Sequence, residues 1–139
     1  MILLDTNIVS ELMKPAPSAA VVAWIGAQPA QGLYTTSITQ AEILHGVMLL
    51  PAGKRRRALN DAAHAMFRED FDGRVLGFGS DAALPYAQIA VDRRESGRPI
   101  SQFDAQIAAI ARCFGATLAT RNVTDFEGCG IELVNPWGA

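Results

Sequence analysis

The chain has 139 residues, which suits one domain with a single core. Half of the residues are hydrophobic and 19% are charged, which excludes a disordered chain and indicates a folded globular protein. A net charge of -2 excludes the strongly basic surface with which proteins usually grip long nucleic acids. Any contact with nucleic acid must therefore be local, assisted by a metal, or supplied partly by a partner.

The two cysteines, Cys113 and Cys129, form no CxxC pair and no zinc-binding pattern. We therefore expect free thiols, as is usual in the reducing cytoplasm. The start of the chain lacks the basic segment of a signal peptide, and the longest apolar stretch, 47–50, ends at Pro51. These features predict a cytoplasmic protein that makes no use of a membrane.

The first half of the chain alternates short apolar runs with helical patterns. Strand-like runs occur at 2–4 and 33–36, the second rich in β-compatible residues. Helices are predicted from Ser18, from Thr39 to about Leu50, and from Lys54 to about Phe67.

The second half continues the alternation. Strands are predicted at 75–78, 117–120 and 131–134, and helices from Ser80 or Asp81 to about Ser96 and from Ser101 to Gly115. Strands separated by helices imply right-handed crossovers and parallel pairing. The predicted fold class is therefore α/β, with a parallel central sheet of about five strands flanked by helices, in a single domain spanning 1–139.

Acidic residues recur where strands end or helices begin. Asp5 directly follows the first strand, and Glu42 and Asp104 lie near the starts of two predicted helices. Asn122 and Asp125 follow the fourth strand. Because ligands bind beyond the carboxyl ends of parallel strands, these side chains could converge on one crevice. Magnesium and manganese prefer such oxygen ligands, and a bound cation would suit hydrolysis of a phosphodiester.

Helix capping is the alternative role for these acids. Thr39 to Glu42 and Ser101 to Asp104 both fit a capping-box pattern, the second more weakly. Asp5 is harder to explain in this way, because an acid at the end of a central strand is costly to bury without a partner.

Small polar residues accompany Asp5. Thr6, Asn7, Ser10 and Thr120 could orient its carboxylate or bond to water on a metal, while Asn7 and Ser10 could equally cap the first short helix.

Taken in order, these motifs resemble the PIN-domain ribonucleases over essentially the whole chain. More closely, they resemble the VapC toxins of bacterial toxin–antitoxin pairs, in the FitB-like branch. The residues that carry the resemblance are 2–7 (ILLDTN), 39–42 (TQAE) with Gly46, Asp104 ahead of Ile107 and Ala108, 120–126 (TRNVTDF) and 135–137 (NPW).

The resemblance implies a PIN-like three-layer sandwich and a Mg²⁺- or Mn²⁺-dependent endoribonuclease. Asp5, Glu42 and Asp104 would take the family's first three acidic positions and hold the metal. Asn122 stands where many relatives carry Asp, which leaves Asp125 as the nearest carboxylate and puts a second metal in doubt.

The resemblance also implies partners. A VapB-type antitoxin would neutralise the toxin and contact operator DNA on its behalf, and the toxin would form a homodimer within a larger toxin–antitoxin assembly. RNA would be the substrate. Arg121 could contact a phosphate, and Lys54 and Arg55, in the only basic run, could steer RNA towards the site. Exposed surface arginines and a solvated first helical turn remain open as alternatives.

Two other functions compete with the nuclease. A phospho-acceptor signalling domain would also place an acidic pocket on a parallel sheet, but it needs an acid pair near the first strand and a lysine after the last. Both lysines, Lys14 and Lys54, lie in the first half. A catalytically weak or inactive PIN-like scaffold, marked by Asn122, stays open.

Overall fold

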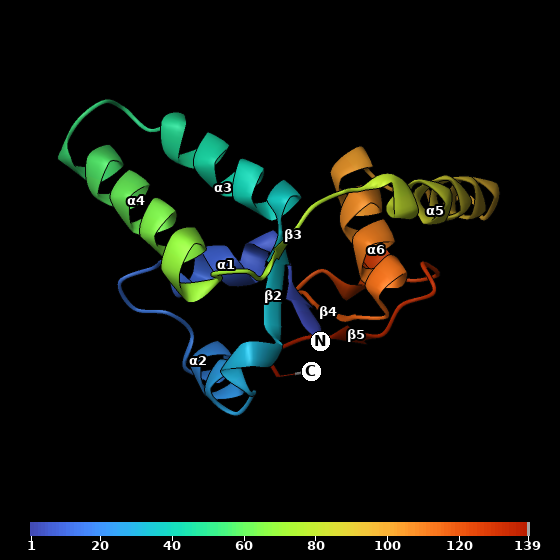
Figure 1. The fold of residues 1–139 in the computed structure, drawn as a ribbon, viewed down its shortest axis with the longest axis horizontal. Coiled ribbons are helices and arrows are strands. Elements are labelled where there is room, and N and C mark those ends of the chain that lie inside the picture. Colours follow the sequence, from blue (N-terminus) through green and yellow to red (C-terminus); the bar gives the residue numbers. More distant parts are fainter. Residues whose placement is uncertain (139) are drawn as a thin grey trace.

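The computed structural model describes residues 1–138, and its centre is a parallel sheet of five strands in the order β3–β2–β1–β4–β5 (Figure 1). The strands are β1 (Ile2–Leu4), β2 (Leu33–Thr36), β3 (Val75–Leu76), β4 (Thr117–Ala119) and β5 (Leu133–Val134). Every neighbouring pair is parallel. The predicted α/β class with five strands is confirmed.

Apolar side chains of β1 alternate between two cores, because successive strand residues point to opposite faces of a sheet. Leu3 belongs to a cluster with Ile89, Ile107 and Leu118, while Leu4 belongs to a cluster with other partners. Those partners include Ile8, Val21, Ile43, Ala63 and Phe67. Each face of the sheet is thus covered by its own helices, which is the three-layer arrangement that the resemblance implied.

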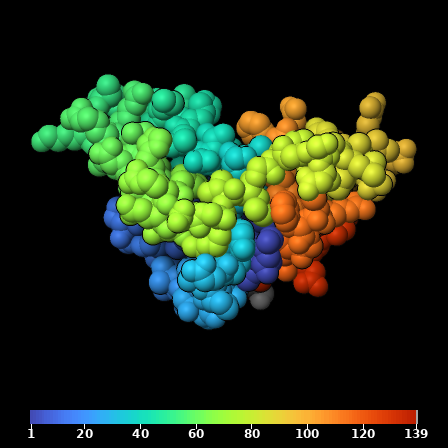
Figure 2. All heavy atoms as spheres, viewed as in Figure 1, coloured from blue at the N-terminus to red at the C-terminus, as the bar shows by residue number. Residues whose placement is uncertain are grey.

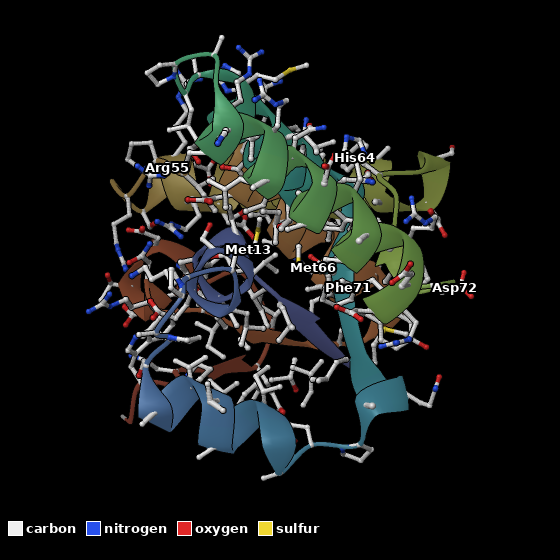
Figure 3. All side chains as sticks on the ribbon, turned by 90° about the vertical axis from the view of Figure 1, so that its left-hand side faces the viewer. Met13, Arg55, His64, Met66, Phe71 and Asp72 are labelled. Atoms are coloured by element: carbon white, nitrogen blue, oxygen red, sulfur yellow. The ribbon has the colours of Figure 1, made fainter. Side chains whose placement is uncertain are left out.

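The helices divide between the two faces. Beside Leu3 lie α5 (Ala83–Glu95) and α6 (Gln102–Phe114), and beside Leu4 lie α1 (Thr6–Leu12), α2 (Ala19–Gly26), α3 (Ser37–Met48) and α4 (Lys54–Ala65). Short helical turns complete the chain at η1 (Ala30–Gly32), η2 (Met66–Asp70), η3 (Ser80–Ala82) and η4 (Val123–Phe126). Figure 3 looks onto α4 and labels Met66, at the start of η2, and Met13, just after α1, which both pack against the Leu4 cluster.

Several predicted boundaries move by a few residues. The third helix begins at Ser37 and not at Thr39, because the hydroxyl of Thr36 accepts the backbone N–H of Thr39 at 3.1 Å and so caps the helix earlier. The third strand ends at Leu76, and Phe78 beyond it packs edge-on against Tyr86.

The α6 helix illustrates how the sequence builds a buried element. Ser101 caps it by accepting the N–H of Asp104, and Gly115 ends it with a positive φ of 64°, as predicted. Ile107 and Ile110 are buried, whereas Phe103 in the first turn is 52% exposed. Across residues 1–138, no helix combines the length and apolar character needed to cross a bilayer.

Candidate active site

Asp5 follows the central strand β1, which has β2 and β3 on one side and β4 and β5 on the other. The neighbours β2 and β4 thus lead to opposite edges of the sheet, and in parallel sheets ligands bind beyond the carboxyl ends of two such strands. A notch between α3 (teal) and α6 (orange) marks the corresponding edge of the molecule in Figure 2. The backbone N–H of Asp5 continues the sheet by donating to the carbonyl of Ala119 at 3.0 Å.

The carboxylate of Asp5 is held by the residues predicted to support it. Its Oδ1 accepts the backbone N–H of Thr6 at 2.8 Å, and its Oδ2 accepts the hydroxyl of Thr120 at 2.8 Å and the amide of Asn7 at 3.4 Å. Asp5 itself is therefore the N-cap of α1, so the expectation that Asn7 or Ser10 caps this helix is wrong. Asp5 caps a helix and keeps only 5% of its surface exposed.

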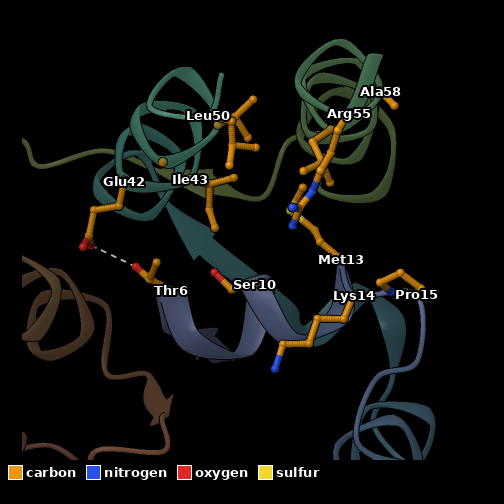
Figure 4. A pocket seen from close by; sticks show the side chains of 13 residues that line it. Thr6, Ser10, Met13, Lys14, Pro15, Glu42, Ile43, Leu50, Arg55 and Ala58 are labelled. Atoms are coloured by element: carbon orange, nitrogen blue, oxygen red, sulfur yellow. Dashed lines mark hydrogen bonds between the residues drawn. The ribbon is translucent and has the colours of Figure 1, made fainter. Parts of the chain in front are cut away.

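Glu42 is tied to the same place through Thr6. The hydroxyl of Thr6 donates to Glu42 Oε1 at 2.9 Å and lies 3.1 Å from the hydroxyl of Thr39 (Figure 4). Since α3 begins at Ser37, Glu42 lies beyond its first turn, and the capping-box interpretation of Glu42 is wrong. Thr6 thus contacts Asp5 with its backbone and Glu42 with its side chain.

The electrostatics join Asp104 to this pair. Burial raises the pKa of Asp5 to about 6, against the lowering effect of hydrogen bonds from Thr120 and Thr6, and the negative charges of Asp104 and Glu42 raise it further. The pKa of half-buried Asp104 is also raised, first by burial and then by Asp125. The charges of Asp104 and Glu42 thus act on Asp5, and the charge of Asp125 acts on Asp104.

Asn122 and Asp125 lie on the segment that follows β4. The backbone N–H of Asn122 donates to the hydroxyl of Thr120 at 3.0 Å, which links this segment to the residue that holds Asp5. Asp125 lies in η4 and is exposed, and its charge acts on Asp104. All five predicted catalytic residues are therefore associated with the same end of the sheet.

The predicted RNA-binding residues separate into two groups. Arg121 donates its backbone N–H to Asn7 Oδ1 at 3.2 Å, and its guanidinium lies 5.0 Å from the ring centre of Trp137. Arg55 lines a cavity of about 510 Å³ between α1, α3 and α4 that also borders Thr6 and Glu42 (Figure 4). Lys54 is exposed at the start of α4 and does not line this cavity.

Sequence reasoning missed one cavity residue and one contact. Lys14 lines the same cavity as Glu42, and only the fold brings these two residues to one place. Thr39, expected as a helix start and capping-box residue, has its hydroxyl 3.1 Å from the hydroxyl of Thr6, a contact that no local signal shows.

The donor chemistry of the site fits a hard divalent cation. Asp5, Glu42 and Asp104 supply carboxylate oxygens. The pKa of Asp5 is raised first by burial and then by the charges of Asp104 and Glu42, and a cation would favour the ionised form against both. Within residues 1–138 no three His, Cys, Asp or Glu side chains form a ready-made metal cluster. Binding a cation would therefore require some adjustment of these side chains.

Comparison with known proteins agrees with this geometry. Residues 2–127 match the PIN-domain family, so the chain belongs to the PIN-domain proteins. This membership removes the phospho-acceptor signalling domain as an alternative.

The nearer relatives are toxins. The chain is 42% identical over 137 residues to the VapC ribonuclease Y4jK of Sinorhizobium fredii, covering 99% of this chain and 98% of that protein. It is 38% identical over 137 residues to toxin FitB of Neisseria gonorrhoeae, covering 99% of each. The structure of FitAB bound to an IR36 DNA fragment superposes with a TM-score of 0.93 and 37% identity, covering 100% of this chain and 97% of the other. The chain is thus a homologue of the VapC and FitB toxins, which confirms the resemblance.

Proposed function

We propose that this protein is a metal-dependent endoribonuclease and the toxin of a toxin–antitoxin pair, hydrolysing RNA phosphodiester bonds in the cytoplasm. The observation that carries the proposal is Asp5, a buried carboxylate whose pKa is raised to about 6 beside two further acids. The full-length likeness to a VapC ribonuclease supports the same reaction. A buried carboxylate with a raised pKa beside other acids is typical of functional sites.

The cofactor in this proposal is Mg²⁺ or Mn²⁺, held by Asp5, Glu42 and Asp104. When bound, such an ion lowers the pKa of a water molecule and stabilises charge on phosphoryl oxygens. The three acids also repel RNA phosphates until a cation neutralises them, so substrate and metal binding should be coupled.

The chain's own residues orient this site. Thr6 and Thr120 fix the carboxylate of Asp5 by hydrogen bonds of 2.8 Å each, and Thr6 fixes Glu42 at 2.9 Å. Asn122, whose backbone N–H donates to Thr120, carries an uncharged side-chain amide that could orient a water or a phosphate without adding repulsion. Arg55 lines the cavity that borders Glu42, and Arg121 follows Thr120 and lies over Trp137; both are candidates to contact RNA phosphates.

The proposed partners follow from the relatives. We propose that a VapB-type antitoxin binds this protein, that operator DNA is contacted through the antitoxin, and that the toxin forms a homodimer within that assembly. The FitAB assembly bound to DNA has the same fold in its toxin-like chain and supports this arrangement.

The proposal is tested by incubating the purified protein with total cellular RNA in Mn²⁺, in Mg²⁺ and in chelator. Asp5→Asn is the test variant, and Glu11→Gln, which alters a buried carboxylate at the other end of α1, is the matched control. Cleavage should need metal, vanish in Asp5→Asn and persist in Glu11→Gln. Absence of cleavage by the wild-type protein under all conditions would instead identify an inactive PIN-like scaffold.

A further inference from the structure

Arg93 is a buried arginine without an obvious reason to be buried. It lies in the last turn of α5 and is only 6% exposed. Its Nε donates to the carbonyl of Arg98 at 2.7 Å, and its Nη1 donates to the carbonyls of Asp125 at 2.6 Å and Glu127 at 3.1 Å. Nη1 also lies 3.7 Å from the sulfur of Cys129.

All four acceptors are uncharged. Burying a guanidinium on neutral acceptors is expensive, because desolvation is not offset by a contacting carboxylate. An apolar side chain of similar size would be the simpler way to fill this place if packing alone mattered. The retained charge therefore indicates a role in the geometry or the field of the neighbouring segments.

The acceptors of Arg93 belong to two segments that carry site residues. Arg98 lies in the connection from α5 to α6, and that connection leads to Asp104 in the first turn of α6. Asp125 and Glu127 lie in the segment that begins at Asn122 after β4. One planar group thus bonds to both connections, and its positive charge lowers the pKa of Asp104 against the effect of burial.

We propose that Arg93 is a positioning residue for the nuclease site, which holds segment 122–127 against the connection that precedes Asp104. The proposal rests on the proposed function, because it assigns to that site a support that touches none of the reacting atoms. The fork of the guanidinium is what the geometry requires, since one lysine ammonium cannot extend to both connections in the same way.

Arg98 provides a matched control. Its side chain is exposed, and its Nη2 donates to the carbonyl of Thr124 at 3.0 Å and to Glu127 Oε2 at 3.0 Å. It therefore bonds to the same segment from the surface, where an ion pair contributes little. Removing its side chain leaves the backbone carbonyl that accepts from Arg93 in place.

The test compares Arg93→Lys, Arg93→Met and Arg98→Ala with the wild-type full chain, under conditions where urea unfolding shows each to be folded. Backbone amides of 122–127 should exchange hydrogen about 10-fold faster in both Arg93 variants and within about twofold of wild type in Arg98→Ala. With Mn²⁺ and RNA, kcat should fall about 30-fold in the Arg93 variants while KM stays within about threefold, because misplacement affects the reacting geometry more than binding.

Unchanged amide exchange in Arg93→Met, or wild-type kcat in Arg93→Lys and Arg93→Met, would overturn the positioning role. A kcat loss that matches the fraction unfolded would do the same, since it would make Arg93 purely structural. Failure of the wild-type protein to cleave RNA would refute the proposed function instead, and the exchange rates would still decide whether Arg93 holds the segment.

Discussion

The two ends of α1 each carry a buried carboxylate, and the two behave in opposite ways. Asp5 at the start of the helix is 5% exposed, and its pKa is raised to about 6. Glu11 near the end is 6% exposed, and its pKa is lowered, first by the ammonium of Lys14 and then by the backbone N–H of Ser18. Lys14 Nζ donates to Glu11 Oε1 at 2.9 Å, and the backbone N–H of Ser18 donates to Glu11 Oε2 at 2.9 Å.

The difference shows that burial alone does not decide the state of an acid. Glu11 forms an ion pair with Lys14 and accepts the N–H of Ser18, so it links α1 to the turn before α2. Asp5 even benefits from a helix N-terminus, yet its charged neighbours are acids. A carboxylate kept without a cation, beside others of the same sign, is prepared for a ligand that brings positive charge.

The largest expected effect separates these two acids by activity. Asp5→Asn should lower kcat for RNA cleavage by about 10³-fold or more, because it removes a charge that binds the metal and leaves the shape of the site nearly unchanged. Glu11→Gln should stay within about threefold of wild type when folded. Kinetics of cleavage of a fluorescent RNA oligonucleotide measure both. Equal losses of kcat in Asp5→Asn and Glu11→Gln would contradict the assignment of a catalytic role to Asp5 and a structural role to Glu11.

The contributions of Asp5 and Glu11 to the free energy of unfolding should depend on pH in opposite directions. Folding favours protonated Asp5, so its contribution to stability is present below about pH 4 and is lost as pH rises through about 6, a loss of about 3 kcal/mol. Glu11, with a lowered pKa, contributes above its ordinary pKa, and that contribution is lost as pH falls.

In chelator at about pH 7, Asp5→Asn should therefore be more stable than wild type by about 2 kcal/mol, after about 1 kcal/mol of lost hydrogen bonding. Glu11→Gln should be less stable than wild type under the same conditions. Urea unfolding across the pH range measures both, and a destabilised Asp5→Asn at neutral pH would contradict the electrostatic account.

A moderate effect is expected where the chain departs from many relatives. Asn122→Asp adds a carboxylate to the segment that bonds to Thr120, so it should tighten Mn²⁺ binding by about 10-fold and further destabilise the metal-free protein. Titration calorimetry measures the affinity. Unchanged binding would mean that residue 122 does not contribute to the metal site.

The smallest effect sharpens the assignment of RNA contacts. Arg55→Ala should raise KM about threefold, because Arg55 lines the cavity beside Glu42, while Lys54→Ala should change it less than about twofold. Both differences should shrink at high salt. A larger effect of Lys54 would place the RNA path outside the cavity.

Much of the fold could be predicted because its signals are local. The strands at 2–4 and 33–36 are reproduced to the residue, since the first is an apolar run that ends at Asp5 and the second is a run of β-compatible residues between Gly32 and Ser37. The start of α3 was predicted two residues late, because Thr36, Ser37 and Thr39 are all plausible caps and only the fold selects one.

For the candidate site, the sequence predicts member residues but not the hydrogen bonds that connect them. Asp5, Glu42 and Asp104 were identified from their places after a strand and near helix starts, yet nothing local shows that Thr6 reaches Glu42 across 36 residues. Arg93 could not be found either, because its burial depends on carbonyls from two connections that meet only in the folded chain.

The most direct measurement of the central claim is proton release when Mn²⁺ binds. Titration calorimetry near pH 6, in buffers of different ionisation enthalpy, should show at least about half a proton released per cation by the wild-type protein, because Asp5 is about half protonated there. Asp5→Asn should bind Mn²⁺ much more weakly. Mn²⁺ binding by Asp5→Asn with wild-type affinity and wild-type proton release would contradict the account.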